Sequence, residues 1–352
     1  ASPAEKEDHM RALCVTRQGD PVTPNIELLD LPEPVPSQGE LLVATEASAL
    51  NHLDLWVGRG LPGIDTQYPH IGGSDGCGRV VGVGAGVDEA WMDQRVIFNF
   101  AVEIPHEPRP NASPAGREIY MIGEHTPGTH AERFTAPASN AVVVGETEDP
   151  IQAAAYGLTH LTAWGMLRTK ARLRAGETVL ITGIGGGVAL AALNIANHFG
   201  CRTIVTSRHQ WKLDKALELG ATDAVLDEGE DWSRTVRSLT DRRGVDICAD
   251  SIGAAVHTSC LKSLARGGRF VACGCTSGAH PKTDLTRLFW NQLQVLGSTM
   301  GDMSEFRQAV ALFTGGHLQP VIDSVVPAAD GQAAFGRIES GAQFGKVVVV
   351  WS

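Results

Sequence analysis

An apolar strand, a glycine-rich turn and an apolar helix follow one another over residues 178–199, and this order constrains the fold more than any other feature. Residues 178–182 (Thr-Val-Leu-Ile-Thr) are typical of a buried parallel strand, and residues 187–199 of a helix. A second strand is expected at residues 202–206. Together these segments predict a βαβ unit, which belongs to a parallel sheet.

Strand and helix patterns keep alternating and predict an α/β domain with a doubly wound parallel sheet over residues 151–301. The remaining strands are expected at residues 224–226, 245–249, 269–273 and 293–297. Residues 11–150 differ, because short β-type runs separated by Gly and Pro predict an irregular, mostly β domain. Residues 302–352 are too few for a separate domain and are expected to complete it. Residues 1–10 are expected to be a tag remnant or disordered.

Charge and composition exclude several classes of function. The 352 residues include 29 Lys and Arg against 40 Asp and Glu, a formal charge of −11, so no nucleic-acid-binding face is expected. No apolar run approaches the roughly 20 residues that a membrane-spanning helix needs. Seven cysteines, an odd number scattered through apolar segments, fit buried thiols in a reducing compartment better than disulfides. We therefore expect a cytoplasmic protein that acts on a small molecule.

The turn after the first strand has the composition of a phosphate-binding loop. Glycines let the backbone approach a pyrophosphate, which would meet free N–H groups at the positive end of the helix. The alternative is a tight turn without a ligand, but the βαβ context favours a dinucleotide. The residues expected to contact its phosphates are Gly183, Gly185, Gly186, Gly187 and Val188.

The end of the second strand indicates which dinucleotide binds. NAD sites usually hold the ribose 2′-hydroxyl with an Asp or Glu about 20 residues after the turn. This chain has no acid between Glu177 and Asp214, and the strand ends in Ser207 and Arg208, with Lys212 one helical turn later. A hydroxyl and a guanidinium suit a 2′-phosphate, so these residues predict NADP(H). The alternative is that Arg208 and Lys212 are solvated residues at the start of a helix.

Several segments, taken in order along the chain, are similar to the motifs of one known family. They are residues 51–54 (Asn-His-Leu-Asp), 71–80 (Ile-Gly-Gly-Ser-Asp-Gly-Cys-Gly-Arg-Val), 161–164 (Leu-Thr-Ala-Trp), 183–189, 297–301 (Gly-Ser-Thr-Met-Gly) and 344–347 (Phe-Gly-Lys-Val). With them the chain resembles the medium-chain dehydrogenase/reductase superfamily over essentially its whole length after Met10. The resemblance implies a GroES-like catalytic domain, a Rossmann nucleotide domain and a homodimer.

The positions that hold zinc in part of this superfamily carry other residues here. Zinc-dependent alcohol dehydrogenases have a Cys, a His and a second Cys where this chain has Asn51, Ser74 and Leu158. None of these three is a good zinc ligand, and residues 101–129, which we expect to form an extended surface loop, lack the cysteines of the structural zinc lobe. We therefore expect no metal. The alternative left open is a site assembled from some of His52, Asp54, His70, His125 and His130.

The chain then resembles the quinone oxidoreductase and enoyl reductase branch, which also carries Asn-x-x-Asp at residues 51–54. This resemblance implies an NADPH-dependent oxidoreductase that delivers hydride to an apolar quinone or α,β-unsaturated carbonyl. The proton donor stays open, because Leu53 and Pro62 stand where relatives have a proton-relay Ser or Thr and an active-site Tyr. Two other interpretations remain: an alcohol or carbonyl dehydrogenase with an atypical site, and an NADP(H)-binding protein without turnover.

The motif at residues 51–54 supplies the catalytic candidates. The Asn51 amide could donate a hydrogen bond to a substrate carbonyl as charge grows there, or Asn51 caps the helix that follows. Asp54 is expected to orient its neighbours rather than to transfer protons. By resemblance, His52 faces the cofactor pyrophosphate.

Further candidates are expected around the cofactor. Thr162 matches a residue beside the nicotinamide carboxamide, with an ordinary helix-interior Thr as the alternative. Cys273 and Gly274 end one expected strand and Thr299 follows another, both at the carboxyl edge of the sheet, where ligands gather. Lys346 matches a basic residue that reaches the cofactor phosphates, with a solvated strand residue as the alternative.

Overall fold

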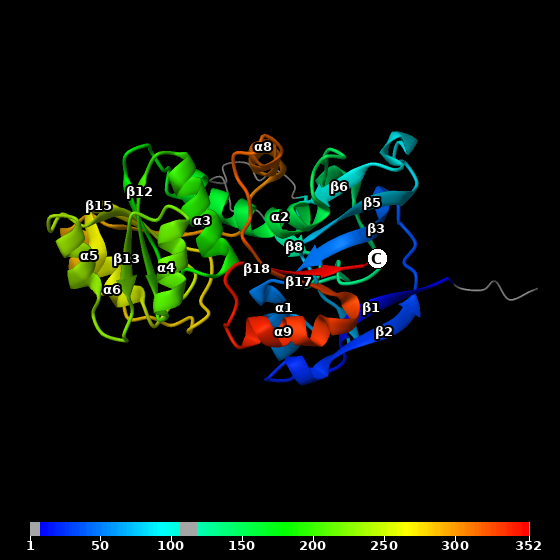
Figure 1. The fold of residues 1–352 in the computed structure, drawn as a ribbon, viewed down its shortest axis with the longest axis horizontal. Helices are drawn as coiled ribbons and strands as arrows, with labels where there is room; N and C mark the ends of the chain where they lie inside the picture. The colour runs from blue at the N-terminus through cyan, green and yellow to red at the C-terminus, as the bar shows by residue number, and fades with distance from the viewer. Residues whose placement is uncertain (1–7, 106–117, 352) are drawn as a thin grey trace, which may run out of the picture. The chain divides into compact units, whose positions relative to one another are not determined.

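A computed structural model describes residues 8–105 and 118–351, and in it the chain forms two compact units (Figure 1). The first unit comprises Ala1–Leu158, Asp302–Val310 and Ile322–Ser352, and the second comprises Thr159–Gly301 and Ala311–Val321. Sequence patterns predicted a boundary after residue 150 and assigned residues 311–321 to the first unit. The change of pattern at residue 150 marks the start of helix α2 (Pro150–Trp164), which extends from the first unit into the second.

The second unit is built on a six-stranded parallel sheet, with strand order β13-β12-β11-β14-β15-β16. Its strands are β11 (Thr178–Ile181), β12 (Arg202–Ser207), β13 (Asp223–Leu226), β14 (Val245–Asp250), β15 (Leu264–Ala272) and β16 (Gln294–Gly297). The intervening helices are α3 (Gly187–His198), α4 (Gln210–Glu218), α5 (Ser233–Leu239), α6 (His257–Ser263) and α7 (Leu285–Trp290). The order confirms a doubly wound sheet, since the chain leaves β11 in one direction and returns to β14. Ligands of such sheets bind where the loops after these two strands diverge.

Apolar side chains on the strands explain why these segments form a buried sheet. Leu180, Ile204, Val225 and Phe270 come from four different strands and are buried in one cluster, together with apolar side chains of α5 and α6. Near-continuous apolar runs are typical of parallel strands, because helices cover both of their faces. The apolar run at residues 178–182 was therefore a reliable indication of this sheet.

The first unit contains three β-sheets among the described residues. The largest has the order β10-β6-β5-β3-β18-β17 with β9 paired to β3, and the smaller ones are β2-β1-β4 and β7-β8. The strands are β1 (His9–Val15), β2 (Ile26–Pro32), β3 (Glu40–Ala49), β4 (His70–Ile71), β5 (Gly76–Val83), β6 (Arg95–Phe98), β7 (Ala101–Glu103), β8 (Ile119–Met121), β9 (Arg133–Pro137), β10 (Ala141–Val143), β17 (Ile322–Pro327) and β18 (Lys346–Val350). Short and mostly antiparallel strands confirm the predicted irregular β domain.

The end of the chain returns to the first unit through β18, which pairs antiparallel with β3 and parallel with β17. The helices of this unit are α1 (His52–Arg59), the first part of α2, the first part of α8 (Met303–Thr314) and α9 (Gly331–Glu339). Short 3-10 turns lie at Thr23–Asn25, Glu89–Trp91, Ala138–Asn140 and Ala328–Asp330, and a π-helix at Gly165–Lys170 continues α2. Strand β18 thus brings Lys346 into the largest sheet.

Two segments differ from the sequence prediction. His9 and Met10 belong to β1, where they pair with Pro32 and Leu31, and Met10 is buried. The prediction of disorder is therefore wrong for His9 and Met10. Residues 1–7 lie outside the described ranges. The loop predicted at residues 101–129 includes the paired strands β7 and β8, and its residues 106–117 also lie outside these ranges.

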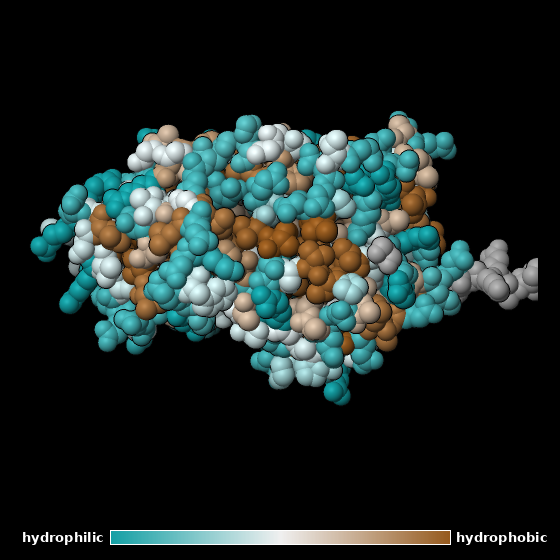
Figure 2. Space-filling model, in the orientation of Figure 1, coloured by the Kyte–Doolittle hydropathy of each residue, from teal (hydrophilic) through white to brown (hydrophobic). Residues whose placement is uncertain are grey.

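Hydrophilic residues cover much of the face seen in Figure 2, and hydrophobic residues are exposed between them. Large exposed apolar side chains of the second unit include Phe289 and Trp290 on α7. Within the described ranges, no helix combines the length and the apolar character that would let it cross a membrane.

Candidate active site

The turn between β11 and α3 has a backbone that requires glycine. Gly183 and Gly185 have φ angles of +64° and +109°, values that other residues rarely adopt. A Cβ on Gly183 would also come within 2.5 Å of Ile252 Cδ1. Helix α3 begins at Gly187 after the N-cap Gly186, and no side chain caps it. Its first N–H groups therefore suit an anion such as a pyrophosphate.

Other predicted cofactor residues meet this turn at the same edge of the sheet. Parallel pairing places Ile181 beside Val205 and Ala272 beside Gly297, so the strands end together. Ser207 is the last residue of β12, and the residues that come shortly after strand ends include Gly183, Arg208, Cys273, Gly274 and Thr299. A small pocket at the first turn of α3 is lined by Thr182, Val188 and Asp250, among others. The residues present here fit a dinucleotide.

The predicted 2′-phosphate site lies at the end of β12. Ser207 Oγ accepts a hydrogen bond from the His209 N–H at 3.2 Å, and the side chain of Arg208 is exposed. Lys212 is buried, with Nζ 5.2 Å from the centre of the Trp211 ring. These positions are compatible with the prediction but do not test it.

An acid that sequence reasoning missed lies next to Ser207. The Asp227 N–H donates to the Ser207 carbonyl oxygen at 2.8 Å, because β13 runs parallel to β12. A ribose-binding acid is usually close in sequence to the end of the second strand, and Asp227 comes 20 residues after Ser207. The register between β12 and β13 was the signal that could have found Asp227.

Asp250 is a second missed residue at this edge. Its carboxylate accepts hydrogen bonds from Thr182 Oγ1 at 2.5 Å and from the Gly253 N–H at 2.9 Å. Burial raises its pKa, and these hydrogen bonds oppose the shift only in part. The sequence pattern ended this strand at residue 249, one residue too early to indicate a polar end.

Thr162 contacts another predicted cofactor segment. Its hydroxyl donates to Met300 Sδ at 3.3 Å, which brings helix α2 against residues 298–301. Thr162 is also a buried helix-interior residue, as the second interpretation expected. Burial raises the pKa of the Cys273 thiol, which directly follows β15, to about 12.

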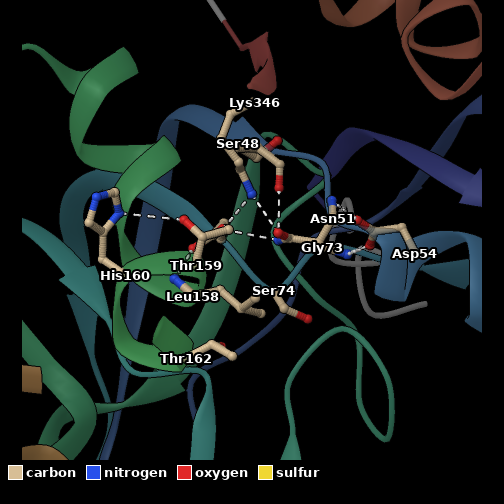
Figure 3. A network of polar contacts seen from close by, with 12 residues as sticks. Ser48, Asn51, Asp54, Gly73, Ser74, Leu158, Thr159, His160, Thr162 and Lys346 are labelled. Carbon is tan, nitrogen blue, oxygen red and sulfur yellow. Dashed lines mark hydrogen bonds and ion pairs between the residues drawn. The ribbon is translucent and has the colours of Figure 1, made fainter. Parts of the chain in front are cut away.

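A cluster of three polar side chains lies inside the first unit. Lys346 Nζ donates to Asn51 Oδ1 at 2.5 Å and to Asp75 Oδ2 at 2.8 Å, and Asn51 Nδ2 donates to the same Asp75 oxygen at 3.0 Å. Lys346 from β18 and Asn51 at the start of α1 point toward each other (Figure 3). Lys346 is 3% exposed and Asp75 is 1% exposed, so their charges are compensated almost entirely by one another.

The second oxygen of Asp75 fixes the cluster to helix α2. Asp75 Oδ1 accepts a hydrogen bond from the Leu158 N–H at 2.7 Å. A Cβ on Gly157 would lie 3.0 Å from this oxygen, so a glycine lets the carboxylate approach the helix. Every oxygen of the carboxylate therefore has a donor, which is what a buried charge requires.

Asp54 holds the two segments that carry the cluster. Its Oδ2 accepts from the Asn51 N–H at 2.7 Å and its Oδ1 from the Gly73 N–H at 2.8 Å. Burial alone would raise its pKa, but His130 beside it and these two N–H groups lower the pKa below its ordinary value. The orienting role of Asp54 stays a prediction, and these contacts are the ones through which it would act.

The predicted roles of Asn51, His52 and Lys346 are not all reflected in their contacts. Asn51 is the N-cap residue of α1, but its amide nitrogen donates to Asp75 and, at 3.4 Å, to the Ala49 carbonyl. His52 is exposed at the first position of α1. Lys346 is neither solvated nor isolated, since its ammonium is held by Asn51 and Asp75. Contact of Lys346 or His52 with cofactor phosphates stays a prediction.

The residues at the family's zinc positions do not fit a zinc ion. Asn51 Oδ1 already accepts the ammonium of Lys346, and Ser74 Oγ donates to the Ile122 carbonyl at 2.7 Å. The third position is Leu158, which offers no ligand atom on its side chain. The histidines of the alternative site are also engaged elsewhere: His70 Nε2 lies 3.0 Å from the Gly123 carbonyl, and His125 Nδ1 accepts from the Met121 N–H. Over residues 8–105 and 118–351, no three His, Cys, Asp or Glu side chains are grouped for a metal.

Known proteins are similar to this chain over nearly its whole length. Residues 37–146 match the family model "Alcohol dehydrogenase GroES-like domain", and residues 187–315 match "Zinc-binding dehydrogenase". The chain is 32% identical to the "Zinc-type alcohol dehydrogenase-like protein YogA" of Leptosphaeria maculans, covering 92% of this chain and 94% of that protein. It is 25% identical to quinone oxidoreductase of Rattus norvegicus, covering 97% and 98% of the two chains. A crystal structure of an NAD-dependent alcohol dehydrogenase is 35% identical, with a TM-score of 0.89 and coverage of 97% and 100%.

Proposed function

We infer the function of this chain from its family, since it belongs to the medium-chain dehydrogenase/reductase superfamily. We propose that it is an NADPH-dependent reductase of quinones or α,β-unsaturated carbonyls, and that it works without a metal ion. Membership of the family makes it an oxidoreductase that uses a nicotinamide cofactor. The observation that carries the finer proposal is the ammonium of Lys346, held by Asn51 and Asp75 in a buried cluster. A built-in cation suits a substrate that needs charge stabilisation but no Lewis acid.

The chemistry divides between cofactor and chain. When bound, the reduced nicotinamide supplies a hydride, which carries both electrons to the β-carbon of an enone or to a quinone. Negative charge then grows on the substrate oxygen, and a proton from water neutralises the product. The helix α3 N-terminus would hold the pyrophosphate, and Ser207 and Arg208 would hold the 2′-phosphate.

We assign the contact with the substrate oxygen to Lys346 rather than to Asn51. An ammonium has three N–H donors, and the contacts of Lys346 within the described residues use two of them, for Asn51 and Asp75. The amide of Asn51 donates to Asp75 and Ala49 and has no further hydrogen to offer. The positive charge of Lys346 also favours an oxyanion more than a neutral amide does.

The test is NADPH consumption with a panel of benzoquinones and enones, with and without EDTA, together with elemental analysis of the purified protein. We expect turnover that EDTA does not reduce and no stoichiometric zinc. One zinc per chain and loss of activity in EDTA would contradict the metal-free mechanism. Tight NADPH binding without turnover of any acceptor would favour a binding protein.

An alcohol dehydrogenase is the second candidate, because the 35% identical structure bears that description together with NAD. Asp227 beside Ser207 is an acid that could hold a ribose hydroxyl. Oxidation of a primary or secondary alcohol with NAD, at a rate above quinone reduction with NADPH, would favour this candidate.

We also propose a homodimer that forms along β16. This strand is at one end of the strand order of the sheet, and Phe289, Trp290 and Val295 around it are 66%, 68% and 49% exposed. A second copy could pair with this edge through its backbone and cover these side chains. Light scattering should give twice the mass of the chain, and Val295→Pro should give the monomer. The matched substitution Val325→Pro, at an exposed site in the first unit, should leave the mass unchanged.

Seven free thiols, five of them buried, support the proposal that the protein works in the cytoplasm.

A further inference from the structure

A row of buried polar side chains leads from Trp351 to Asp54 in the first unit. Trp351 Nε1 donates to Ser48 Oγ at 2.8 Å, and Ser48 Oγ lies 2.9 Å from His130 Nδ1. The other ring nitrogen, His130 Nε2, lies 3.5 Å from Asp54 Oδ1. Ser48 and His130 have no exposed surface, so the hydrogen atoms of these groups must be shared within the protein.

The contacts determine which nitrogen of His130 carries the hydrogen. An indole N–H can only donate, so Ser48 Oγ accepts from Trp351. The hydroxyl hydrogen of Ser48 then has His130 Nδ1 as its acceptor among the described contacts. Nδ1 therefore carries a lone pair, and Nε2 carries the hydrogen. Nε2 makes no hydrogen bond with the described residues, but the Asp54 carboxylate oxygen lies 3.5 Å away and attracts the positive end of an N–H dipole.

The same contacts make the other two protonation states of the His130 ring less favourable. With the hydrogen on Nδ1 instead, the Nε2 lone pair would face a carboxylate oxygen at 3.5 Å. In that state, and in the doubly protonated ring, Ser48 would accept two hydrogen bonds and its own hydrogen would have no acceptor. A buried donor without an acceptor is costly.

The row of polar side chains ends at Asp54, whose carboxylate holds the candidate catalytic cluster. Asp54 accepts the N–H groups of Asn51 and Gly73, the first at the start of α1 and the second shortly before Asp75. Asn51 and Asp75 in turn hold the ammonium of Lys346. A change at His130 thus reaches the cluster through Asp54 without touching it directly.

We propose that His130 is a positioning residue for the reaction. Trp351 and Ser48 hold its ring as the Nε2–H tautomer. The Nε2–H group in turn keeps the Asp54 carboxylate where it accepts the N–H groups of Asn51 and Gly73. This inference rests on the proposed function for its effect on turnover. The tautomer and the protection of the two N–H groups are properties of the folded chain and can be measured without a substrate.

The first experiment is nitrogen NMR of the full chain labelled with ¹⁵N-histidine, with His130 assigned from the spectrum of His130→Gln. We expect a protonated Nε2 and an unprotonated Nδ1. Trp351→Phe and Ser48→Ala should move the His130 signals. Trp232→Phe and Ser263→Ala, at equally buried positions of the second unit, should leave them unchanged.

The second experiment compares His130→Gln with His130→Asn. The side-chain amide of Gln reaches the place of the Nε2 atom, and the side-chain amide of Asn reaches the place of the Nδ1 atom. Hydrogen exchange of the Asn51 and Gly73 N–H groups should stay slow in His130→Gln and become fast in His130→Asn and His130→Ala. With NADPH and an accepted quinone or enone, kcat should fall about 100-fold in His130→Ala and be largely rescued in His130→Gln, while the KM for NADPH is unchanged.

Three results would overturn the proposal: a hydrogen on Nδ1, a doubly protonated ring at neutral pH, or unchanged exchange at Asn51 and Gly73 in His130→Ala. If no acceptor supports turnover, the proposed function fails, and the tautomer and exchange measurements still decide the positioning role.

Discussion

The glycine turn of the second unit and the Lys346 cluster of the first unit are built in opposite ways. The turn is made by consecutive residues, and its ability to hold an anion comes from backbone N–H groups at the start of α3. The cluster is made by side chains from distant parts of the sequence, since 271 residues separate Asp75 from Lys346. The turn consequently depends on its glycines, whereas each member of the cluster depends on polar side chains from the other segments.

The cation that joins the cluster is part of the chain itself. A divalent cation can hold together ligands from separate segments, and in this chain an ammonium on β18 holds Asn51 and Asp75. The ammonium is covalently part of the chain, so the cluster forms only when the sheet pairs β18 with β3. Four predictions test the comparison, from the largest expected effect to the smallest.

Lys346→Met should have the largest effect, because it leaves the buried Asp75 carboxylate without its cation. Removal of one partner of a buried pair costs about 3–5 kcal/mol, measured here as the loss in free energy of unfolding by urea. Asp75→Asn added to Lys346→Met should recover most of this stability. Both variants should lose about 100-fold in kcat with the best quinone or enone. If the double variant recovers activity as well as stability, the cluster has only a structural role.

Gly183→Ala tests the backbone-built region. Its φ of +64° and the contact with Ile252 predict a loss of about 1–3 kcal/mol in stability and about tenfold weaker NADPH binding. Gly200→Ala is the matched control, since Gly200 has a φ of +68° but nothing within 4 Å of a Cβ. Titration of cofactor fluorescence should show weaker binding only for Gly183→Ala, and equal affinities in both variants would contradict the assigned site.

Arg208→Gln tests which dinucleotide the carboxyl edge accepts. Loss of a charge-assisted hydrogen bond to a 2′-phosphate should weaken NADPH binding about tenfold and leave NADH binding unchanged. Arg234→Gln, at an exposed site on α5, serves as the control. A preference for NADH in the unaltered protein, lost in Asp227→Asn, would instead assign the edge to NAD.

The smallest effect is expected from pH acting on His70. Burial lowers the pKa of this histidine, so the folded chain keeps it neutral where the unfolded chain takes up a proton. Stability should therefore fall as the pH drops below about 6.5, because the unfolded state then binds more protons. His70→Gln should reduce the loss between pH 7.5 and 5.5 by at most about 1 kcal/mol in urea titrations. An unchanged pH dependence in this variant would show that other groups are responsible.

The sequence predicted the second unit better than the first for a physical reason. Hydrophobic periodicity is local, so the strand at residues 178–182 and the helix at 187–199 were found close to their observed bounds. Residues 302–352 were assigned to the first domain, but the pairing of β18 with β3 and β17 was not predicted. Pairing register depends on the whole sheet, and this is why Asp227 was overlooked at the carboxyl edge.

The candidate site shows the same limit more clearly. Asn51 and Asp54 were singled out from one short motif, but Lys346 was expected at the cofactor phosphates, with no connection to either. The contact between Lys346 and Asn51 follows from the antiparallel pairing of β18 with β3, which places the start of β18 near the end of β3. A sequence read segment by segment contains no signal for that pairing.

The late position of β18 has a consequence for synthesis of the chain. Asp75 leaves the ribosome 271 residues before Lys346, which at about 5–20 residues per second amounts to a delay of roughly 15–50 seconds. During this delay the nascent β3–β5 sheet carries a carboxylate that cannot be buried without cost. The parallel sheet of the second unit can complete its folding in the meantime, so the part of the molecule translated first is the last to close.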